Sequence, residues 1–127
     1  AYESDESGRR EVYVQAFPLT GGKWQVSSSG GRLPVWRAHG GELFYIDNDD
    51  QLVAVPVDTE NGFHLGTPLP LFHAQLLHHN NIAPTYDASA DGQRFLLMEL
   101  SEDPGAQQAS VTLVRNWPVN TGVQTDR

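Results

Sequence analysis

Hydrophobic residues along this chain occur in short runs that turn-forming residues separate. Most runs are rich in β-branched and aromatic side chains, which favour strands, and glycine, asparagine or aspartate closes them. The pattern predicts strands at Glu11–Phe17, Lys23–Ser27, Leu33–Arg37, Glu42–Asp47, Gln51–Val57, Leu69–His73, Gln93–Leu100 and Ser110–Trp117. The best helical window, Ala74–His79, is long enough only for a turn. An all-β fold is therefore expected.

Some of the predicted strands carry large apolar side chains on both faces. Val12 and Val14 point to one side of their strand, while Tyr13 and Phe17 point to the other. The run Phe95–Met98 is apolar throughout. Strands that are apolar on both faces belong between layers, so we expect sheets that stack on one another.

The length and composition fit one globular domain with many short elements. The chain has 127 residues, of which 39% are hydrophobic and 9% aromatic, and it contains 12 glycines and 8 prolines. The domain is expected to span residues 1–120, and the polar residues 118–127 are expected to form a frayed tail.

The charge of the chain limits its partners. Sixteen acidic residues against eight basic ones give a formal net charge of −8. Such a surface repels phosphate, so neither nucleic acid nor direct contact with an anionic membrane surface is expected. No apolar run approaches the roughly 18 residues that cross a bilayer.

Cysteine and leader patterns are absent from the sequence. The chain contains no cysteine, which excludes disulfides, thiolate catalysis and thiol-ligated metals. The first residues, Ala1–Glu6, are acidic and polar, the opposite of a secretory leader. An export signal would therefore lie outside this chain, and the residues by themselves do not fix a compartment.

Two stretches of the chain repeat one pattern: an aromatic residue, a small-residue turn that ends in glycine, and a polar pair before an apolar strand. From Arg37 and Ser89 onward they run in register at an offset of 52 residues (89 − 37). The segment Glu11–Val14 similarly matches Gln51–Val55, 40–41 residues farther along the chain. Units of about 40–50 residues with several strands are typical of β-propeller blades. Blade-like units are expected at about 1–30, 31–80 and 81–118.

Residues spread from Tyr2 to Trp117 match a known repeat pattern both in identity and in spacing. They are Tyr2–Gly8, Glu11–Gln15, Phe17–Pro18, Gly22–Ser27, Gly31, Pro34, Trp36, Glu42–Tyr45, Val53–Val57, Phe63, Gly66, Pro68, Leu71–Phe72, Tyr86–Asp87, Ser89, Asp91–Leu97 and Asn116–Trp117. These residues resemble the C-terminal repeats of TolB-like (WD-repeat-like) β-propellers, in the form attached to bacterial membrane serine/threonine protein kinases. The Ser-Pro-Asp-Gly turn of that family is replaced by Arg37–Gly40 and Ser89–Gly92, both without proline.

The resemblance implies antiparallel four-stranded blades in a partial β-propeller of about two and a half blades, against about four to eight in a closed ring. It also implies a location outside the cytoplasm, in the periplasm. The residues themselves contain no kinase chemistry. Lys23 is the only lysine, and the sequence has no glycine-rich phosphate loop, His-Arg-Asp or Asp-Phe-Gly motif.

Several polar clusters were weighed as chemical sites. His78 and His79, with His73 from a neighbouring strand, are weak candidates for a metal site, because adjacent residues of an extended segment face opposite ways. Asp47–Asp50 lacks the glycine and glutamate of a calcium loop and favours a hairpin turn. Ser89 lacks a nucleophile-elbow motif and fits a turn cap. No catalytic residue, metal or cofactor is expected.

The large aromatic residues are expected mainly to fill the core between blades. Trp36 should be well buried against Phe44 or Tyr86, and its replacement by alanine should cost more than that of the peripheral Trp24. Trp24 and Tyr13 are the expected exceptions and are the candidates for an exposed ligand or partner surface.

These observations predict a non-catalytic β-propeller-type module that binds a protein or peptide or scaffolds an assembly. The alternative is a propeller that forms an accessory part of an enzyme, such as a peptidase or another hydrolase. A nucleophile, base and acid that converge in a pocket would favour the alternative.

An incomplete propeller also predicts assembly. Tyr2–Val14 is interpreted as starting at the second strand of a blade, and Tyr86–Trp117 as lacking an outer strand. Such ends leave unpaired edges and uncovered apolar faces. If the chain is complete, a homo-oligomer formed by symmetric exchange or head-to-tail closure is expected. A compact sandwich or small barrel within one copy is the alternative.

Overall fold

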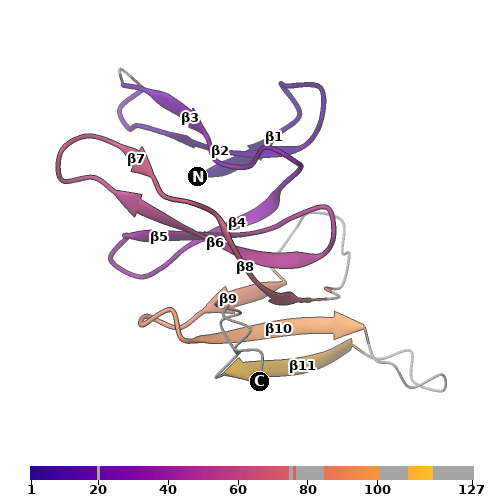
Figure 1. The fold of residues 1–127 in the computed structure, drawn as a ribbon. Coiled ribbons are helices and arrows are strands. Elements are labelled where there is room, and N and C mark those ends of the chain that lie inside the picture. Colours follow the sequence, from indigo (N-terminus) through magenta and orange to yellow (C-terminus); the bar gives the residue numbers. More distant parts are fainter. Residues whose placement is uncertain (20, 75, 77–84, 101–108, 116–127) are drawn as a thin grey trace, which may run out of the picture.

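The chain folds into three antiparallel β-sheets that follow one another in sequence (Figure 1). The computed structural model describes residues 1–19, 21–74, 76, 85–100 and 109–115, and no helix occurs in them. The strands are β1 (Tyr2–Ser4), β2 (Glu11–Gln15), β3 (Lys23–Gln25), β4 (Arg32–Trp36), β5 (Glu42–Ile46), β6 (Gln51–Asp58), β7 (His64–Leu65), β8 (Leu69–His73), β9 (Tyr86–Ala88), β10 (Arg94–Leu100) and β11 (Ala109–Arg115). The predicted all-β fold is confirmed.

In each sheet the first three strands lie side by side in the order in which they follow one another along the chain. The first sheet has the order β1-β2-β3, and the last sheet has the order β9-β10-β11. In the middle sheet β4, β5 and β6 lie side by side, and both β7 and β8 pair with β6. The three sheets fall within the three unit ranges that the repeat suggested.

Two layers of apolar side chains join the sheets. Val12 and Val14 of the first sheet pack against Leu43, Tyr45 and other residues of the middle sheet. The opposite side of the middle sheet packs against the last sheet; the buried residues there are Phe44, Ile46, Leu52, Ala54, Ala74, Leu76, Tyr86, Phe95 and Leu97. The middle sheet is therefore covered on both faces, as its apolar strands predicted.

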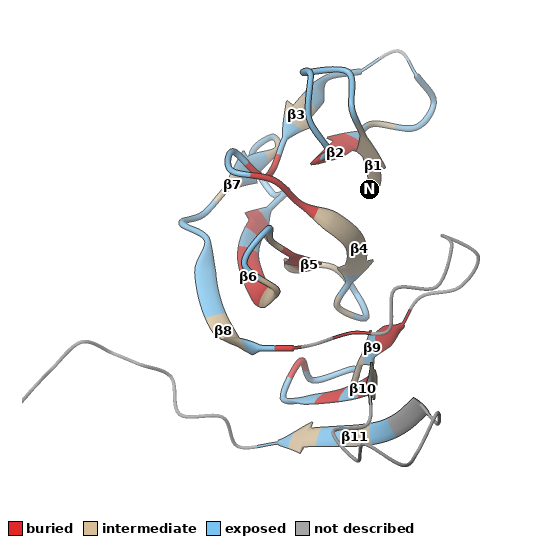
Figure 2. Cartoon of the chain, turned by 90° about the vertical axis from the view of Figure 1, so that its right-hand side faces the viewer, coloured by how far each residue is buried: buried red, intermediate tan, exposed pale blue. Residues whose placement is uncertain are grey.

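The three sheets radiate from one side of the molecule. The strand β1 contacts β4, and β4 contacts β9, so the first strands of successive sheets are neighbours. In Figure 2 the sheets spread like a fan from this side, with β3, β8 and β11 farthest from it. The described strands form three such sheets and do not close into a ring.

Two expectations about apolar faces are wrong. Phe17 is 94% exposed, because β2 ends at Gln15 and the chain turns away from the sheet before reaching it. The run Phe95–Met98 alternates between buried and exposed side chains, because no other described sheet lies against one face of the last sheet. The short strands β1, β7 and β9 are not among the predicted strand ranges.

Candidate functional site

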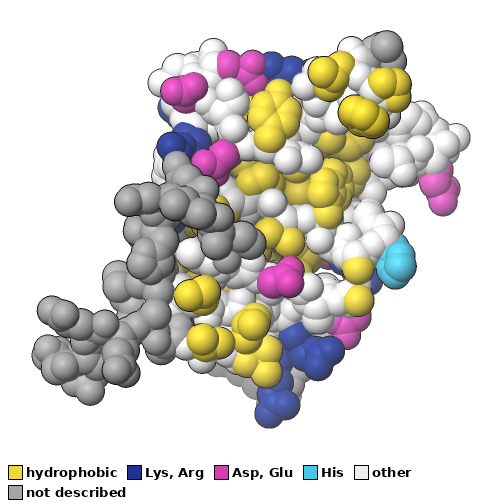
Figure 3. Space-filling model, turned by 180° about the vertical axis from the view of Figure 1, so that it is seen from behind, with side chains coloured by type: hydrophobic (Ala, Val, Ile, Leu, Met, Phe, Trp, Pro, Cys, Tyr) yellow, Lys and Arg dark blue, Asp and Glu magenta, His cyan; other side chains and the backbone are white. Residues whose placement is uncertain are grey.

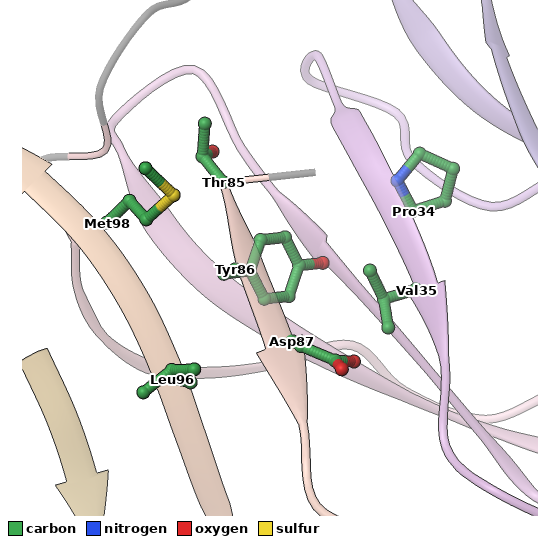
Figure 4. A pocket seen from close by; sticks show the side chains of 7 residues that line it. All are labelled: Pro34, Val35, Thr85, Tyr86, Asp87, Leu96 and Met98. Atoms are coloured by element: carbon green, nitrogen blue, oxygen red, sulfur yellow. The ribbon is translucent and has the colours of Figure 1, made fainter. Parts of the chain in front are cut away.

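A hollow lies where the last sheet meets the first strand of the middle sheet. Its volume is about 570 Å³, and it is lined by Pro34 and Val35 of β4, by Thr85, Tyr86 and Asp87 at β9, and by Leu96 and Met98 of β10 (Figure 4). We call this hollow the β4–β9 groove. Most of its lining is apolar, and its polar side chains all come from one short stretch, 85–87.

Tyr86 fixes β9 against β4. Its buried ring lies between the two strands, and its hydroxyl donates a 2.7 Å hydrogen bond to the main-chain oxygen of Leu33 (Figure 4). Leu33 has a φ of 53° at an irregularity in the pairing of β4 with β5. Burial, followed by the neighbouring charge of Asp87, raises the pKa of the Tyr86 hydroxyl well above its ordinary value. The hydroxyl is therefore a neutral structural donor.

Thr85 contributes a buried hydroxyl to the groove. Its side chain is 5% exposed, and its Oγ1 has no hydrogen-bond partner in the part of the chain that the structure describes. The main chain of Thr85 is satisfied, since its oxygen accepts the N–H of Met98 at 2.8 Å. A buried polar atom without a partner costs about 1–3 kcal/mol. A bound group that pairs with this hydroxyl would recover that energy.

Asp87 places an exposed carboxylate at the mouth of the groove. From Asp87 and Leu96 the groove continues into a smaller hollow of about 280 Å³, whose other lining residues include Arg94 and Leu113. The groove thus has an apolar floor, a buried hydroxyl and charged groups of both signs at its rim.

The apolar floor extends across the outer side of the last sheet. Leu96 pairs with Leu113, and Met98 pairs with Val111, so the four side chains lie on one face. Their exposed fractions are 49% for Leu96, 38% for Met98, 66% for Val111 and 58% for Leu113. Figure 3 shows hydrophobic side chains gathered over the last sheet, beside Lys and Arg side chains. We call this surface the open face.

Ser89 caps a turn, as its sequence pattern suggested. Its hydroxyl donates to the carboxylate of Asp91 and accepts the N–H of Arg94 at 3.0 Å. The bond from Ser89, a main-chain bond from Gln93 and the charge of Arg94 hold the pKa of Asp91 below its ordinary value. No histidine takes part in these bonds, which organise the turn between β9 and β10.

The aspartate-rich segment Asp47–Asp50 forms the hairpin turn that was predicted. One carboxylate oxygen of Asp47 accepts the N–H groups of Asp49 and Gln51, each at 2.9 Å. Asp50 lies in the left-handed region with a φ of 56° and forms an ion pair with Arg32.

The histidine candidates do not form a described site. His73 is exposed at the end of β8, and His78 and His79 lie outside the described residues. Within the described ranges, no group of three or more His, Asp or Glu side chains is placed to hold a metal ion.

The aromatic residues differ from their predicted exposure. Tyr13 is 4% exposed, because Tyr2 stacks on it at 5.7 Å and Lys23 covers its ring, so the expectation of an exposed Tyr13 is wrong. Trp24 is half-buried, and its ring lies 4.3 Å from that of Phe63. Trp36 is 37% exposed, so its predicted burial is also wrong. It is the last residue of β4, where fewer neighbours cover it.

Comparison of the chain with protein-family models, curated proteins and solved structures finds no match. In the described part of the chain, no helix has the length and apolar character needed to cross a membrane.

The groove residues Thr85, Asp87 and Leu96 were not singled out from the sequence. The repeat contains a signal for Asp87. Asp87 pairs with Leu96 as Val35 pairs with Phe44, and each residue of the first pair follows its counterpart by 52 positions. A carboxylate therefore takes the place of an apolar side chain on the strand that lines the groove.

Proposed function

We propose that this chain is a non-catalytic β-propeller-type module that binds a protein or peptide partner and so scaffolds an assembly. The radial arrangement of the sheets carries the proposal. All three sheets start at the same side of the molecule, and their first strands β1, β4 and β9 lie next to one another. Blades of a propeller are arranged in this way around their axis.

The β4–β9 groove and the open face form the proposed binding surface. Four exposed aliphatic side chains adjoin one another on one sheet face, and contiguous apolar surface can mark an interaction site. The buried Oγ1 of Thr85 and the carboxylate of Asp87 supply the few polar groups that orient a ligand. A partner with apolar side chains, a hydrogen-bond donor and a basic group matches this chemistry.

A library of random displayed peptides tests the proposal. The chain is immobilised at low density, so that copies stay apart, and the enriched peptides are then measured in solution by fluorescence anisotropy. We expect peptides that combine apolar and basic residues. Leu96→Glu should weaken their binding at least about tenfold, because a charge then has to be buried in the contact.

Leu19→Glu is the matched control. Leu19 is an exposed apolar residue in the segment between β2 and β3, away from the groove. The control variant should bind the peptides as tightly as the parent chain. Failure to enrich any peptide, or equal binding by Leu96→Glu and the parent chain, would contradict the proposal.

A further inference from the structure

We propose that the β4–β9 groove binds a lysine side chain of the polypeptide partner, with the hydroxyl of Thr85 and the carboxylate of Asp87 as acceptors for its ammonium group. The inference rests on the proposed function and names the chemical group that the groove recognises. Two polar and two apolar side chains of the last sheet carry it.

The polar and apolar side chains of the groove form two adjacent rows. In the antiparallel pairing of β9 with β10, Leu96 lies opposite Asp87. Two residues away, the main-chain oxygen of Thr85 accepts the N–H of Met98 at 2.8 Å, so these two residues also lie opposite each other. All four side chains therefore share one face of the sheet and line the groove (Figure 4). A side chain with an apolar stem and a charged end fits against such a pair of rows.

Thr85 supplies a buried acceptor that the described fold does not use. Its side chain is 5% exposed, and its Oγ1 has no hydrogen-bond partner among the described residues. Burial of a hydroxyl without a partner is unfavourable, whereas a hydrogen bond from a charged donor offsets that cost. The neighbouring Met98 is unbranched, flexible and 38% exposed, so a change of its rotamer gives a ligand access to the hydroxyl.

Asp87 supplies a negative charge at the rim of the groove. Its side chain is exposed, and it takes part in no ion pair within the described ranges. Arg94 borders the smaller hollow beside Asp87 without forming such a pair. A carboxylate without an ion pair, on a chain with a net charge of −8, attracts a cationic group.

The arrangement of the two acceptors favours an ammonium group over a guanidinium group. The three donors of an ammonium group diverge from one nitrogen, so they can reach oxygens of two separate side chains at about 2.8 Å each. A guanidinium group binds best through two parallel bonds to both oxygens of one carboxylate. In Asp87 one of these oxygens already accepts the N–H of Ala88 at 2.8 Å. The groove therefore matches lysine better than arginine.

The two acceptors should contribute unequally to the affinity. A buried hydrogen bond to a charged group changes an affinity about tenfold. An ion pair at an exposed carboxylate changes it only about threefold, because water screens the charges. Thr85 should therefore contribute more than Asp87.

Methyl NMR of the 127-residue chain tests the proposal. Met98 is the only methionine in the sequence, so carbon-13 labelling of methionine methyl groups gives one signal, and this signal comes from the groove. The probe is lysine capped by an acetyl group on its α-amine and a methylamide on its carboxyl group. Capped norleucine has the same stem without the ammonium group, and capped arginine carries a guanidinium group. We expect capped lysine to shift the signal saturably, and capped norleucine to bind at least about tenfold more weakly.

Two groove variants and one control separate the contributions. Thr85→Val should weaken the binding of capped lysine about tenfold, yet it should raise the urea midpoint of unfolding, because it removes a buried hydroxyl without a partner. Asp87→Asn should weaken the binding about threefold, and its side-chain oxygen can still accept the N–H of Ala88. Asp49→Asn makes the same change of charge at an exposed residue that does not line the groove, and it should leave the binding unchanged.

Several results would overturn the proposal. A urea midpoint that does not rise in Thr85→Val would show that its hydroxyl has a partner within the fold. Equal binding of capped norleucine would mean that the groove recognises only apolar surface, and tighter binding of capped arginine would assign it to a guanidinium group. Equal weakening by Asp87→Asn and Asp49→Asn would indicate attraction by net charge alone.

Failure of this inference can be distinguished from failure of the proposed function. If capped lysine does not bind while the displayed library still yields peptides that depend on Leu96, the proposed function stands with another group in the groove. If the library yields no peptide either, both proposals fail.

Discussion

The hydroxyl of Ser27 donates a hydrogen bond to the carboxylate of Glu11, and both residues are buried. The same hydroxyl accepts the N–H of Val12 at 2.8 Å. Both oxygens of Glu11 also accept the N–H of Gly30 at 3.1 Å. This network joins β2 to the segment that leads into β4. It therefore fixes the first sheet relative to the middle sheet.

Replacement of Ser27 by alanine should lower the free energy of unfolding by about 1–3 kcal/mol. The variant removes a donor from a buried carboxylate and leaves the N–H of Val12 without its partner. Urea unfolding followed by circular dichroism measures the loss. Ser28→Ala is the matched control, because Ser28 is exposed, and it should change the free energy by less than about 0.5 kcal/mol. Equal losses in the two variants would show that the network does not stabilise the fold.

The stability of the chain should fall in acid because of Glu11. Desolvation acts to raise the pKa of this buried carboxyl, but hydrogen bonds from Ser27, Arg9 and Gly30 outweigh it and hold the pKa below its ordinary value. A group whose pKa is lower in the folded state stabilises the fold above its unfolded pKa, and this contribution is lost as the pH falls through the folded pKa.

Urea midpoints between pH 7 and pH 2 measure this effect. The parent chain should lose stability as the pH falls below the ordinary range of a glutamate. Glu11→Gln should be less stable at pH 7 and should lose less on acidification. Asp91, whose pKa is also lowered, remains in both proteins and cancels in the comparison. Parallel pH profiles would argue against a role for the Glu11 carboxylate.

Trp24 is better packed than Trp36, which is the opposite of the order of burial predicted from the sequence. Trp24 packs with the apolar layer between the first and middle sheets and contacts Phe63, whereas Trp36 is an exposed residue at a strand end. Trp24→Ala should therefore cost about 2–3 kcal/mol, and Trp36→Ala about 1–2 kcal/mol, both below the cost for a fully buried ring. Urea midpoints of the two variants show which replacement lowers the stability more. A larger loss for Trp36→Ala would restore the order predicted from the sequence.

The sequence was informative where hydrophobic alternation and turn chemistry act locally. Glycine and aspartate turns placed the hairpins of the middle sheet within one or two residues, because the residues themselves fix those backbone conformations. The strand β9 was missed because its three residues gain their structure from the pairing with β10 and from the bond between Tyr86 and Leu33. Local propensity does not contain that information.

The exposure of individual side chains was less predictable from the sequence than the positions of the strands. Alternation assigned Tyr13 and Phe17 to one side of a strand. It could not show that Tyr2 and Lys23 cover the ring of Tyr13. Nor could it show that the strand ends before it reaches Phe17. The β4–β9 groove depends in the same way on how two sheets stack. The polar Thr85 becomes notable only when the fold buries its hydroxyl without a hydrogen-bond partner among the described residues.

The boundary between the middle and last sheets should dominate the stability of the chain. Phe95 is fully buried there, and its ring meets those of Phe44 at 4.9 Å and Phe72 at 5.7 Å, both edge to face. Phe95→Ala should cost about 3–5 kcal/mol, because a cavity replaces an aromatic ring on which both sheets pack. Phe17→Ala makes the same chemical change at an almost fully exposed side chain and should cost less than about 0.5 kcal/mol. Urea unfolding of both variants, read by circular dichroism, measures the difference. Similar small losses in the two variants would mean that the last sheet does not depend on the middle sheet for its stability.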